Sequence, residues 1–335
     1  MMNKSVISYG VYLPYLRIKR DEYISTLGSC SAAFKEKAVM DIDEDIITMA
    51  IEAARDAIAG LDAAQIGALS LASANFPYSE KVMAGTVIEA LGLNHNILTC
   101  QHANSTQAGT EAFLSALGLL DQTDQKYALV IVADAPTAVA AADLEHGFGA
   151  GACAFVLAKD EPGLVFEGVY AQTGEAMGLR YRRSGETEVR DIGVKTYATQ
   201  VYNEIVKGAV QGMTKKLQLT PNDYIHLILH QNDAKTAAAL AKKIGFSEEQ
   251  QKHGQLFSLV GDTGACSAML GLCNVLDNAH SGERILVCSY GSGAGSHAIS
   301  FKLSGACKNN RPVKSLLENK KYISYIYYLK LKRCI

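Results

Sequence analysis

The sequence lacks most of the features that mark membrane, secreted or metal-binding proteins. Its 335 residues contain no apolar run near the roughly 20 residues that a membrane span needs. The eight cysteines are scattered, with no Cys-x-x-Cys pair and no Cys/His cluster, so we expect neither a zinc site nor a disulfide framework. The N-terminal residues lead straight into a predicted strand at residues 4–13, so we expect no signal peptide and a reducing, cytoplasmic location.

The chain also has no large excess of positive or negative charge. The net charge is −2, which argues against general nucleic-acid binding. Hydrophobic residues make up 48% of the chain and charged residues 20%, a composition typical of a soluble globular protein with a large core. Cysteines inside apolar runs, such as Cys153 and Cys288, are expected to behave as small buried hydrophobic residues.

What the chain does have is an internal repeat. Two runs with apolar residues at helical spacing end in Leu-Asp-Gln at residues 120–122 and in Leu-Asp-Asn at residues 276–278, a shift of 156 residues. The same shift pairs the apolar strands 129–132 and 285–288, and the strands 69–71 and 225–227. The glycine motifs at 147–151 and 291–295 are 144 residues apart, which a difference in loop length would explain. A register held over several elements indicates a duplicated α/β unit.

The repeat selects three candidate site residues. Thr106 lies between a predicted strand and a predicted helix, where helix amides point at developing negative charge, although an ordinary N-cap residue is the alternative. The shift of 156 residues places Asp262 at the equivalent position of the second half and pairs Ala74 with His230. Because a duplicated fold can bring equivalent loops together at its pseudo-twofold axis, we expect Thr106, His230 and Asp262 to share a pocket. Asp262 close to His230 is expected to raise the pKa of the imidazole.

Composition divides the chain into three parts. The linker 159–163 separates an N-terminal half, residues 1–160, from a C-terminal half, residues 161–304. The polar stretch 180–186 is expected to be a solvated surface loop, with an anion-binding loop as the alternative. The tail, residues 305–335, holds eight Lys or Arg residues against one Glu and is rich in tyrosine. We expect this tail to be a docked helix or strand, with binding of an acidic partner, a membrane surface or a nucleotide as the alternatives.

These motifs resemble the thiolase superfamily and, within it, hydroxymethylglutaryl-CoA synthases of the archaeal and bacterial kind. The resembling stretches are Ile7–Pro14, Ala108–Thr110 and Ser289–Gly293, and the segment Lys321–Tyr325 is similar to the C-terminal segment of that family. Condensing acetyltransferases of the ketoacyl synthase III type are similarly close. The resemblance implies a duplicated, five-layered α/β/α/β/α thiolase fold. The helices that start near Gln107 and Thr263 would then lie at its centre.

The resemblance also exposes three departures from the family pattern. The nucleophilic Cys of the family falls on Thr106, its acid/base Glu on Ala74, and its Asn near the second central helix on Asp262. A threonine lacks the low pKa of an activated thiol and therefore needs an adjacent base. The loss of a carboxyl group at Ala74 removes the proton donor for the aldol step that forms hydroxymethylglutaryl-CoA.

Three other positions keep the family pattern. The resemblance implies that His230 serves as the base, that Lys235 binds the phosphates of coenzyme A, and that the Gly293 amide helps to hold an oxyanion. A coenzyme A thioester is thus expected as a substrate, with no tightly bound cofactor and no metal.

Two functions follow from this combination. The first is an acyltransferase or condensing enzyme that acts on acyl-CoA or acyl-carrier thioesters, by acylation of Thr106 or Ser105 or by direct transfer. The second is a non-catalytic thiolase-fold subunit that partners an active paralogue. The resemblance further implies a homodimer, or a heteromer with such a paralogue and a small zinc-ribbon/OB-fold protein. No nucleic-acid or membrane partner is expected.

Overall fold

Five strands of the first half form one side of a nine-stranded sheet in the computed structural model, which describes residues 3–335. Their order across the sheet is β5-β4-β6-β7-β1. The strands are β1 (Lys4–Tyr12), β4 (Ile66–Ala72), β5 (Leu98–His102), β6 (Tyr127–Asp134) and β7 (Gly151–Lys159). Strand β4 pairs in parallel with β5 and β6, whereas β7 runs antiparallel to β6 and β1. Met1 and Met2, which begin the segment expected to hold no signal peptide, lie outside the described residues.

The second half repeats this order in mirror image. Its strands follow as β8-β11-β10-β9, with β9 parallel to β10 and the other pairs antiparallel. They are β8 (Leu164–Thr173), β9 (His226–Leu229), β10 (Arg284–Cys288) and β11 (Gly295–Leu303). The halves meet at β1 and β8, which share only two residue pairs. The predicted duplication is confirmed, and the linker 159–163 forms the turn between β7 and β8.

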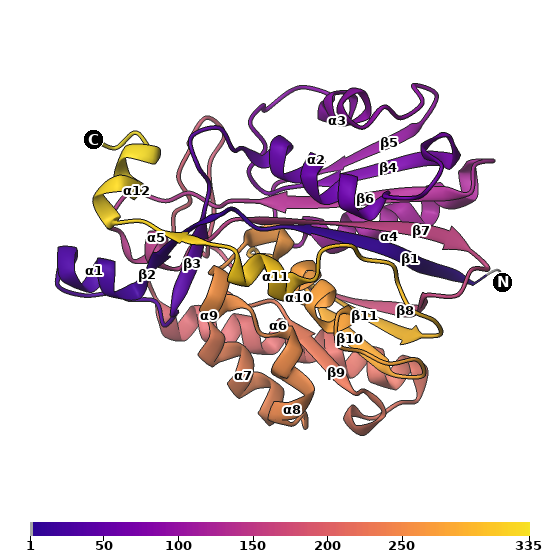
Figure 1. Cartoon of the computed structure of the whole chain (residues 1–335). Helices are drawn as coiled ribbons and strands as arrows, with labels where there is room; N and C mark the ends of the chain where they lie inside the picture. Colours follow the sequence, from indigo (N-terminus) through magenta and orange to yellow (C-terminus); the bar gives the residue numbers. More distant parts are fainter. Residues whose placement is uncertain (1–2) are drawn as a thin grey trace.

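Two helices lie between the two halves of the sheet (Figure 1). They are α4 (Ala108–Leu119) and α10 (Ser267–Leu276), the latter preceded by a 3₁₀ turn at residues 264–266. In β6, Val130 and Val132 face the central cluster with these helices, while Leu129 and Ile131 face the outer helices of the first half. This alternation is the period-two pattern of a strand covered on both faces. The predicted pair of central helices is confirmed.

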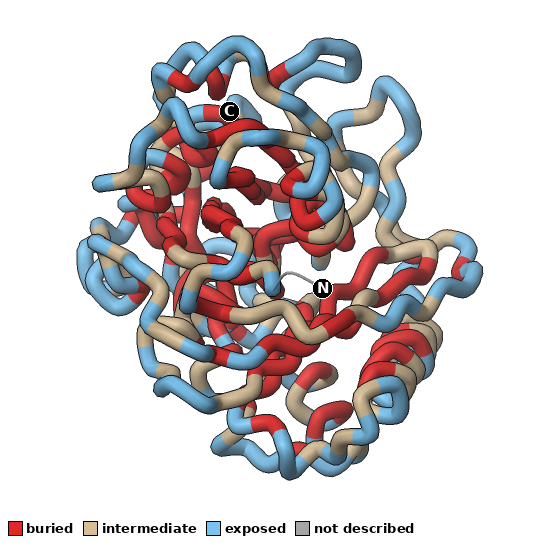
Figure 2. Tube along the Cα trace, turned by 90° about the vertical axis from the view of Figure 1, so that its right-hand side faces the viewer, coloured by how far each residue is buried: buried red, intermediate tan, exposed pale blue. Residues whose placement is uncertain are grey.

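The outer helices complete five layers. One side is covered by α2 (Ile46–Ala57) and α3 (Met83–Leu91), and the other by α6 (Lys195–Leu217) and α7 (Ala234–Lys243). The shorter helices are α5 (Asp143–Gly147), α8 (Glu248–Gln251) and α9 (Phe257–Val260). Five 3₁₀ turns lie at residues 63–65, 120–122, 221–223, 252–254 and 264–266. Figure 2 shows that buried segments run through the middle of the molecule and that exposed loops surround them.

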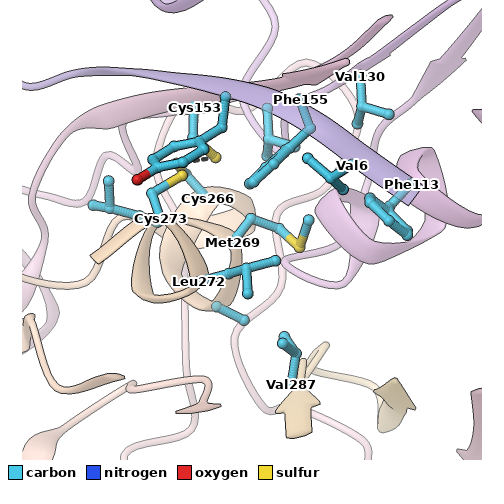
Figure 3. Close-up of a cluster of buried hydrophobic side chains, with 14 of the residues drawn as sticks. Val6, Phe113, Val130, Cys153, Phe155, Cys266, Met269, Leu272, Cys273 and Val287 are labelled. Carbon is cyan, nitrogen blue, oxygen red and sulfur yellow. Dashed lines mark hydrogen bonds between the residues drawn. The ribbon is translucent and has the colours of Figure 1, made fainter. Parts of the chain in front are cut away.

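The central layer packs aromatic rings and sulfur atoms tightly. Phe113 of α4 meets Phe155 and Phe301 edge to face, at ring-centroid distances of 6.3 and 5.4 Å. Cys153 and Cys266 lie beside each other (Figure 3), with sulfur atoms 3.5 Å apart. Cys153 and Cys288 are fully buried, which confirms their expected role as small hydrophobic residues. Across residues 3–335, no helix combines the length and apolar character required to span a membrane.

The tail is docked, as expected. Its elements are α11 (Val313–Glu318), β12 (Lys321–Tyr322) and α12 (Tyr325–Leu331). Strand β12 joins β2 (Leu16–Lys19) and β3 (Glu36–Val39) in a small second sheet, next to α1 (Arg20–Leu27). Tyr325 and Tyr328 are buried in this cluster, where Lys37 and Glu145 form a buried ion pair of 2.9 Å.

Candidate active site

The loop that leads from β5 into α4 places Thr106 at the start of the central helix. Asn104 adopts a left-handed conformation, with φ of 69°, which turns the chain sharply out of the strand. The Ser105 hydroxyl then accepts a hydrogen bond from the Gln107 amide at 3.0 Å, so Ser105 stabilises the turn. Thr106 is 5% exposed and lies one residue before the helix N-cap, Gln107.

The Thr106 hydroxyl is engaged by the other half of the molecule. It donates a hydrogen bond of 2.6 Å to the backbone carbonyl of Tyr290, which follows β10. A peptide carbonyl cannot take the proton as a base, so this contact orients the hydroxyl without activating it. Thr106 makes no hydrogen bond with His230 within the part of the chain that the structure describes.

A tight glycine-containing loop closes over this junction. Gly291 and Gly295 exchange backbone hydrogen bonds of 2.8 Å, and a Cβ atom on Gly291 would overlap the Ser105 hydroxyl. Gly293, at the tip, has φ of 113°, a conformation that favours glycine. Among residues 3–335, the backbone amides of Gly293 and Thr106 donate to no protein acceptor. The role of the Gly293 amide in holding an oxyanion stays a prediction.

His230 is held rigidly at the end of β9. Its amide donates to the Cys288 carbonyl at 2.8 Å, and its carbonyl accepts from the Tyr202 hydroxyl at 2.7 Å. The imidazole is 1% exposed, and neither ring nitrogen has a hydrogen-bond partner among the described residues. Burial lowers the pKa of His230 to about 4, although Asp262 acts in the opposite direction. The expected upward effect of Asp262 on this pKa is present, but burial outweighs it, so the net shift is downward and the imidazole is neutral at pH 7.

Asp262 is paired with an arginine in addition to lying near His230. Its Oδ1 atom lies 3.9 Å from His230 Nε2 and accepts a hydrogen bond from the Gly264 amide at 2.9 Å. Its other carboxylate oxygen forms an ion pair with Arg180, whose guanidinium also lies 4.9 Å from the centroid of the Phe148 ring. Arg180 thus compensates the buried charge of Asp262.

A second carboxyl group near Thr106 was missed by the sequence analysis. Asp134, at the end of β6, is fully buried and accepts hydrogen bonds from the amides of Ala265 (2.8 Å), Ala135 (3.0 Å) and Ala74 (3.3 Å). Burial raises the pKa of Asp134 against these hydrogen bonds. An acidic residue at the end of an apolar strand was the available signal, because ligands of open α/β sheets bind at the carboxyl ends of strands.

A cavity of about 180 Å³ lies beside Thr106, Asp134 and Arg180. Its walls are formed by Ala74, Asn75, Asn104, Ser105, Thr106, Asp134, Pro136, Arg180, Tyr181, Arg182, Val189 and Ser292. Thr106 is on the wall, whereas His230 and Asp262 are not; Asp262 reaches the cavity only through Arg180. Neither Gly293 nor Lys235 is part of the wall.

The segment 180–186 is not the fully solvated loop that was expected. The Arg180 side chain is 11% exposed, and both Arg180 and Arg182 line the cavity. Arg180 adopts a positive φ of 36°, an uncommon conformation for a residue other than glycine. The positions of the two arginines favour the alternative expectation for this stretch, that of an anion-binding loop.

Lys235 lies apart from this cavity. It is exposed in the first turn of α7, whose N-terminus is capped by the Asp233 carboxylate through the Thr236 amide at 2.8 Å. Its predicted contact with coenzyme A stays a prediction. Among residues 3–335, no group of three or more His, Cys, Asp or Glu side chains is arranged to hold a metal ion.

The duplicated five-layered fold is that of the thiolase superfamily. Residues 214–303 match the family model described as the C-terminal part of 3-oxoacyl-[acyl-carrier-protein] synthase III. The chain is 32% identical to the hydroxymethylglutaryl-CoA synthase of Caldivirga maquilingensis, over 100% of this chain and 99% of that protein. It is 34% identical to the enzyme of the same name from Methanocaldococcus jannaschii, over 98% and 99% of the two chains. The chain belongs to the hydroxymethylglutaryl-CoA synthase family.

Solved structures agree on the fold. The structure described as MvaS in complex with 3-hydroxy-3-methylglutaryl coenzyme A matches with a TM-score of 0.87 at 20% identity, covering 99% of this chain and 92% of that one. The curacin-pathway HMG synthase in complex with an acetyl donor acyl carrier protein also gives 0.87, at 18% identity and with coverage of 98% and 88%. At these identities the similarity concerns the fold alone.

Proposed function

We propose that this chain is an acyltransferase that binds a thioester of coenzyme A or of an acyl carrier protein at the Thr106 cavity. The observation that carries the proposal is the position of Thr106 on the cavity wall, at the start of α4, with uncommitted amides at Thr106 and Gly293. The named functions of the relatives, and the coenzyme A and carrier-protein complexes of the similar structures, support the class of substrate.

In the proposed reaction, the Thr106 oxygen forms a bond to the thioester carbonyl carbon while its proton passes to neutral His230. The negative charge that develops on the carbonyl oxygen is held by the Thr106 and Gly293 amides. When the carbon–sulfur bond breaks, the departing thiolate takes the proton back from His230. The Thr106 hydroxyl must first leave the Tyr290 carbonyl, to which it donates in this structure.

Formation of hydroxymethylglutaryl-CoA itself is not part of the proposal. Ala74 offers no carboxyl group at the position where the family places its acid/base Glu, and Asp134 accepts three backbone hydrogen bonds. Acyl transfer needs only a nucleophile, a base and an oxyanion site, and we assign these roles to Thr106, His230 and the two amides.

We also propose how the chain binds its substrate and its protein partners. Lys235 binds the nucleotide phosphates of coenzyme A, which acts as a substrate and not as a tightly bound cofactor. The protein works in the cytoplasm as a homodimer, or with a thiolase-fold paralogue and a small zinc-ribbon/OB-fold protein. Support for these parts comes from the family resemblance and from the exposed position of Lys235.

A second candidate is a non-catalytic subunit with the same cavity. It is favoured by the hydrogen bond from Thr106 to the Tyr290 carbonyl, which leaves the hydroxyl without an adjacent base. In this case the cavity would bind a thioester or serve only the packing of the two halves.

Intact-mass spectrometry after incubation with acetyl-CoA separates the two candidates. The acyltransferase proposal expects wild type to gain one acetyl group and Thr106→Ala to gain none. If wild type stays unmodified while Thr106→Cys is acetylated, the cavity is an intact thiolase-type site without its own nucleophile, and the second candidate holds. Equal acyl transfer by wild type and Thr106→Ala would exclude Thr106 and favour direct transfer through His230.

A further inference from the structure

Arg182 brings an unmatched positive charge to the wall of the cavity. Its guanidinium donates to the Asn75 side-chain oxygen, to the Ala74 carbonyl at 2.6 Å and to the Thr187 carbonyl at 3.4 Å. All three acceptors are uncharged. Within residues 3–335, no carboxylate lies within 4.0 Å of this guanidinium, in contrast to that of Arg180, which is paired with Asp262.

Donor capacity remains on the same guanidinium. Of its five N–H groups, the three hydrogen bonds use both of those on Nη1 and one of those on Nη2. The Nε group and the second Nη2 hydrogen donate to no acceptor among the described residues. Nε and Nη2 lie along one edge of a planar group and match the two oxygens of a carboxylate.

The cavity wall contains only one carboxyl group that could offset this charge, that of Asp134. Its oxygens already accept from three backbone amides, and it makes no ion pair within the described chain. Residue 74, whose carbonyl accepts a hydrogen bond from Arg182, is an alanine and supplies no carboxylate. The positive charge of Arg182 is thus left for a ligand.

We propose that the acyl group transferred at this site carries a carboxylate, as a malonyl or succinyl group does, and that Arg182 binds this carboxylate. This inference rests on the proposed function, because it concerns the acyl end of the same thioester. The cavity of about 180 Å³ has room for about six water-sized groups, which suits a short acyl chain.

The test compares malonyl-CoA with isovaleryl-CoA, in which an uncharged isopropyl group of similar size replaces the carboxylate. Binding is measured by isothermal titration calorimetry at low salt. Both ligands carry the same coenzyme A portion, so a difference in affinity reports on the acyl group. Wild type is expected to bind malonyl-CoA about ten- to hundred-fold more tightly, the range of one charge-assisted pair. Arg182→Met should lose this preference by weakening malonyl-CoA alone, and Arg182→Lys should keep part of it.

Two further variants make the test specific. Arg183→Met removes an exposed arginine of the same segment that does not line the cavity, and it should leave both affinities unchanged. Ala74→Glu supplies an internal carboxylate to Arg182 and should abolish the preference in a protein whose arginine is intact. Equal affinities in wild type, or a preference that survives in Arg182→Met, would overturn the inference while leaving the proposed function standing. Binding of neither thioester would overturn both.

Discussion

The carboxylate of Asp262 is held by the guanidinium of Arg180, which comes from a loop 82 residues earlier in the chain. Both side chains are nearly excluded from solvent, with 2% and 11% exposed. Removing one partner of a buried ion pair costs about 3–5 kcal/mol, because the other charge stays buried without compensation. The pair therefore fixes the segment that carries Arg180 and Arg182 onto the site.

Arg180→Met is expected to lower the free energy of unfolding by about 3 kcal/mol, because it leaves Asp262 uncompensated. The measurement is urea denaturation followed by circular dichroism. Arg180→Met combined with Asp262→Asn removes both charges and should recover most of the loss. A double variant whose destabilisation equals the sum of the two single losses would show that the two side chains do not interact.

The low pKa of His230 predicts a specific pH dependence of stability. The unfolded imidazole has a pKa of about 6.5 and the folded one a pKa of about 4, so between these values the unfolded state binds a proton that the native state does not. Stability is therefore lost as the pH falls through this window, by about 2 kcal/mol between pH 6.5 and pH 5.

The measurement is the unfolding free energy of wild type and of His230→Phe at both pH values. The difference between the two proteins should shrink as the pH falls, since only wild type carries the buried imidazole. A difference that is constant with pH would mean that His230 keeps an ordinary pKa in the folded protein.

The buried ion pair of Lys37 and Glu145 contacts the tail, because the Tyr325 hydroxyl donates to Glu145 at 3.4 Å and the Lys37 ammonium lies 5.1 Å from the Tyr328 ring centroid. Burial lowers the pKa of Lys37 to about 8, and the Glu145 carboxylate also accepts a hydrogen bond of 2.6 Å from Tyr23. Glu145→Gln should cost about 3 kcal/mol, since the ammonium of Lys37 stays buried. Glu249→Gln, which breaks the exposed pair of Glu249 with Lys252, is the matched control and should change thermal unfolding little. Equal shifts in thermal unfolding for the two changes would contradict a structural role for the buried pair of Lys37 and Glu145.

Much of the fold could be predicted because it depends on hydrophobic periodicity and on an internal repeat, which the sequence shows directly. The shift of 156 residues that pairs the strands 129–132 and 285–288 corresponds to the mirrored strand orders of the two halves. Both strands are apolar over their length because helices cover both faces. The sequence alone therefore indicates where these strands lie. The family resemblance placed the start of α4 near Gln107, and the helix begins at Ala108.

The site was predictable only in part. The repeat selected Thr106, His230 and Asp262, and the structure places the last two 3.9 Å apart. It could not show that Thr106 donates to the Tyr290 carbonyl, since this depends on the rotamer of one side chain. Nor could it place Arg180, because a positive φ in an irregular loop leaves no periodic signal. The sign of the His230 pKa shift depended on burial, which outweighs the nearby carboxylate.

Peptide mapping by mass spectrometry tests the central claim most directly, because it shows which residue carries the acyl group. Wild type is incubated with acetyl-CoA and, separately, with malonyl-CoA, quenched in acid and digested, and Thr106→Ala is treated in parallel. With at least one of the two thioesters, an acyl ester is expected on Thr106 in wild type, and no acyl group is expected on the equivalent peptide of Thr106→Ala. Acylation confined to surface lysines with both thioesters, equal in both proteins, would contradict this claim.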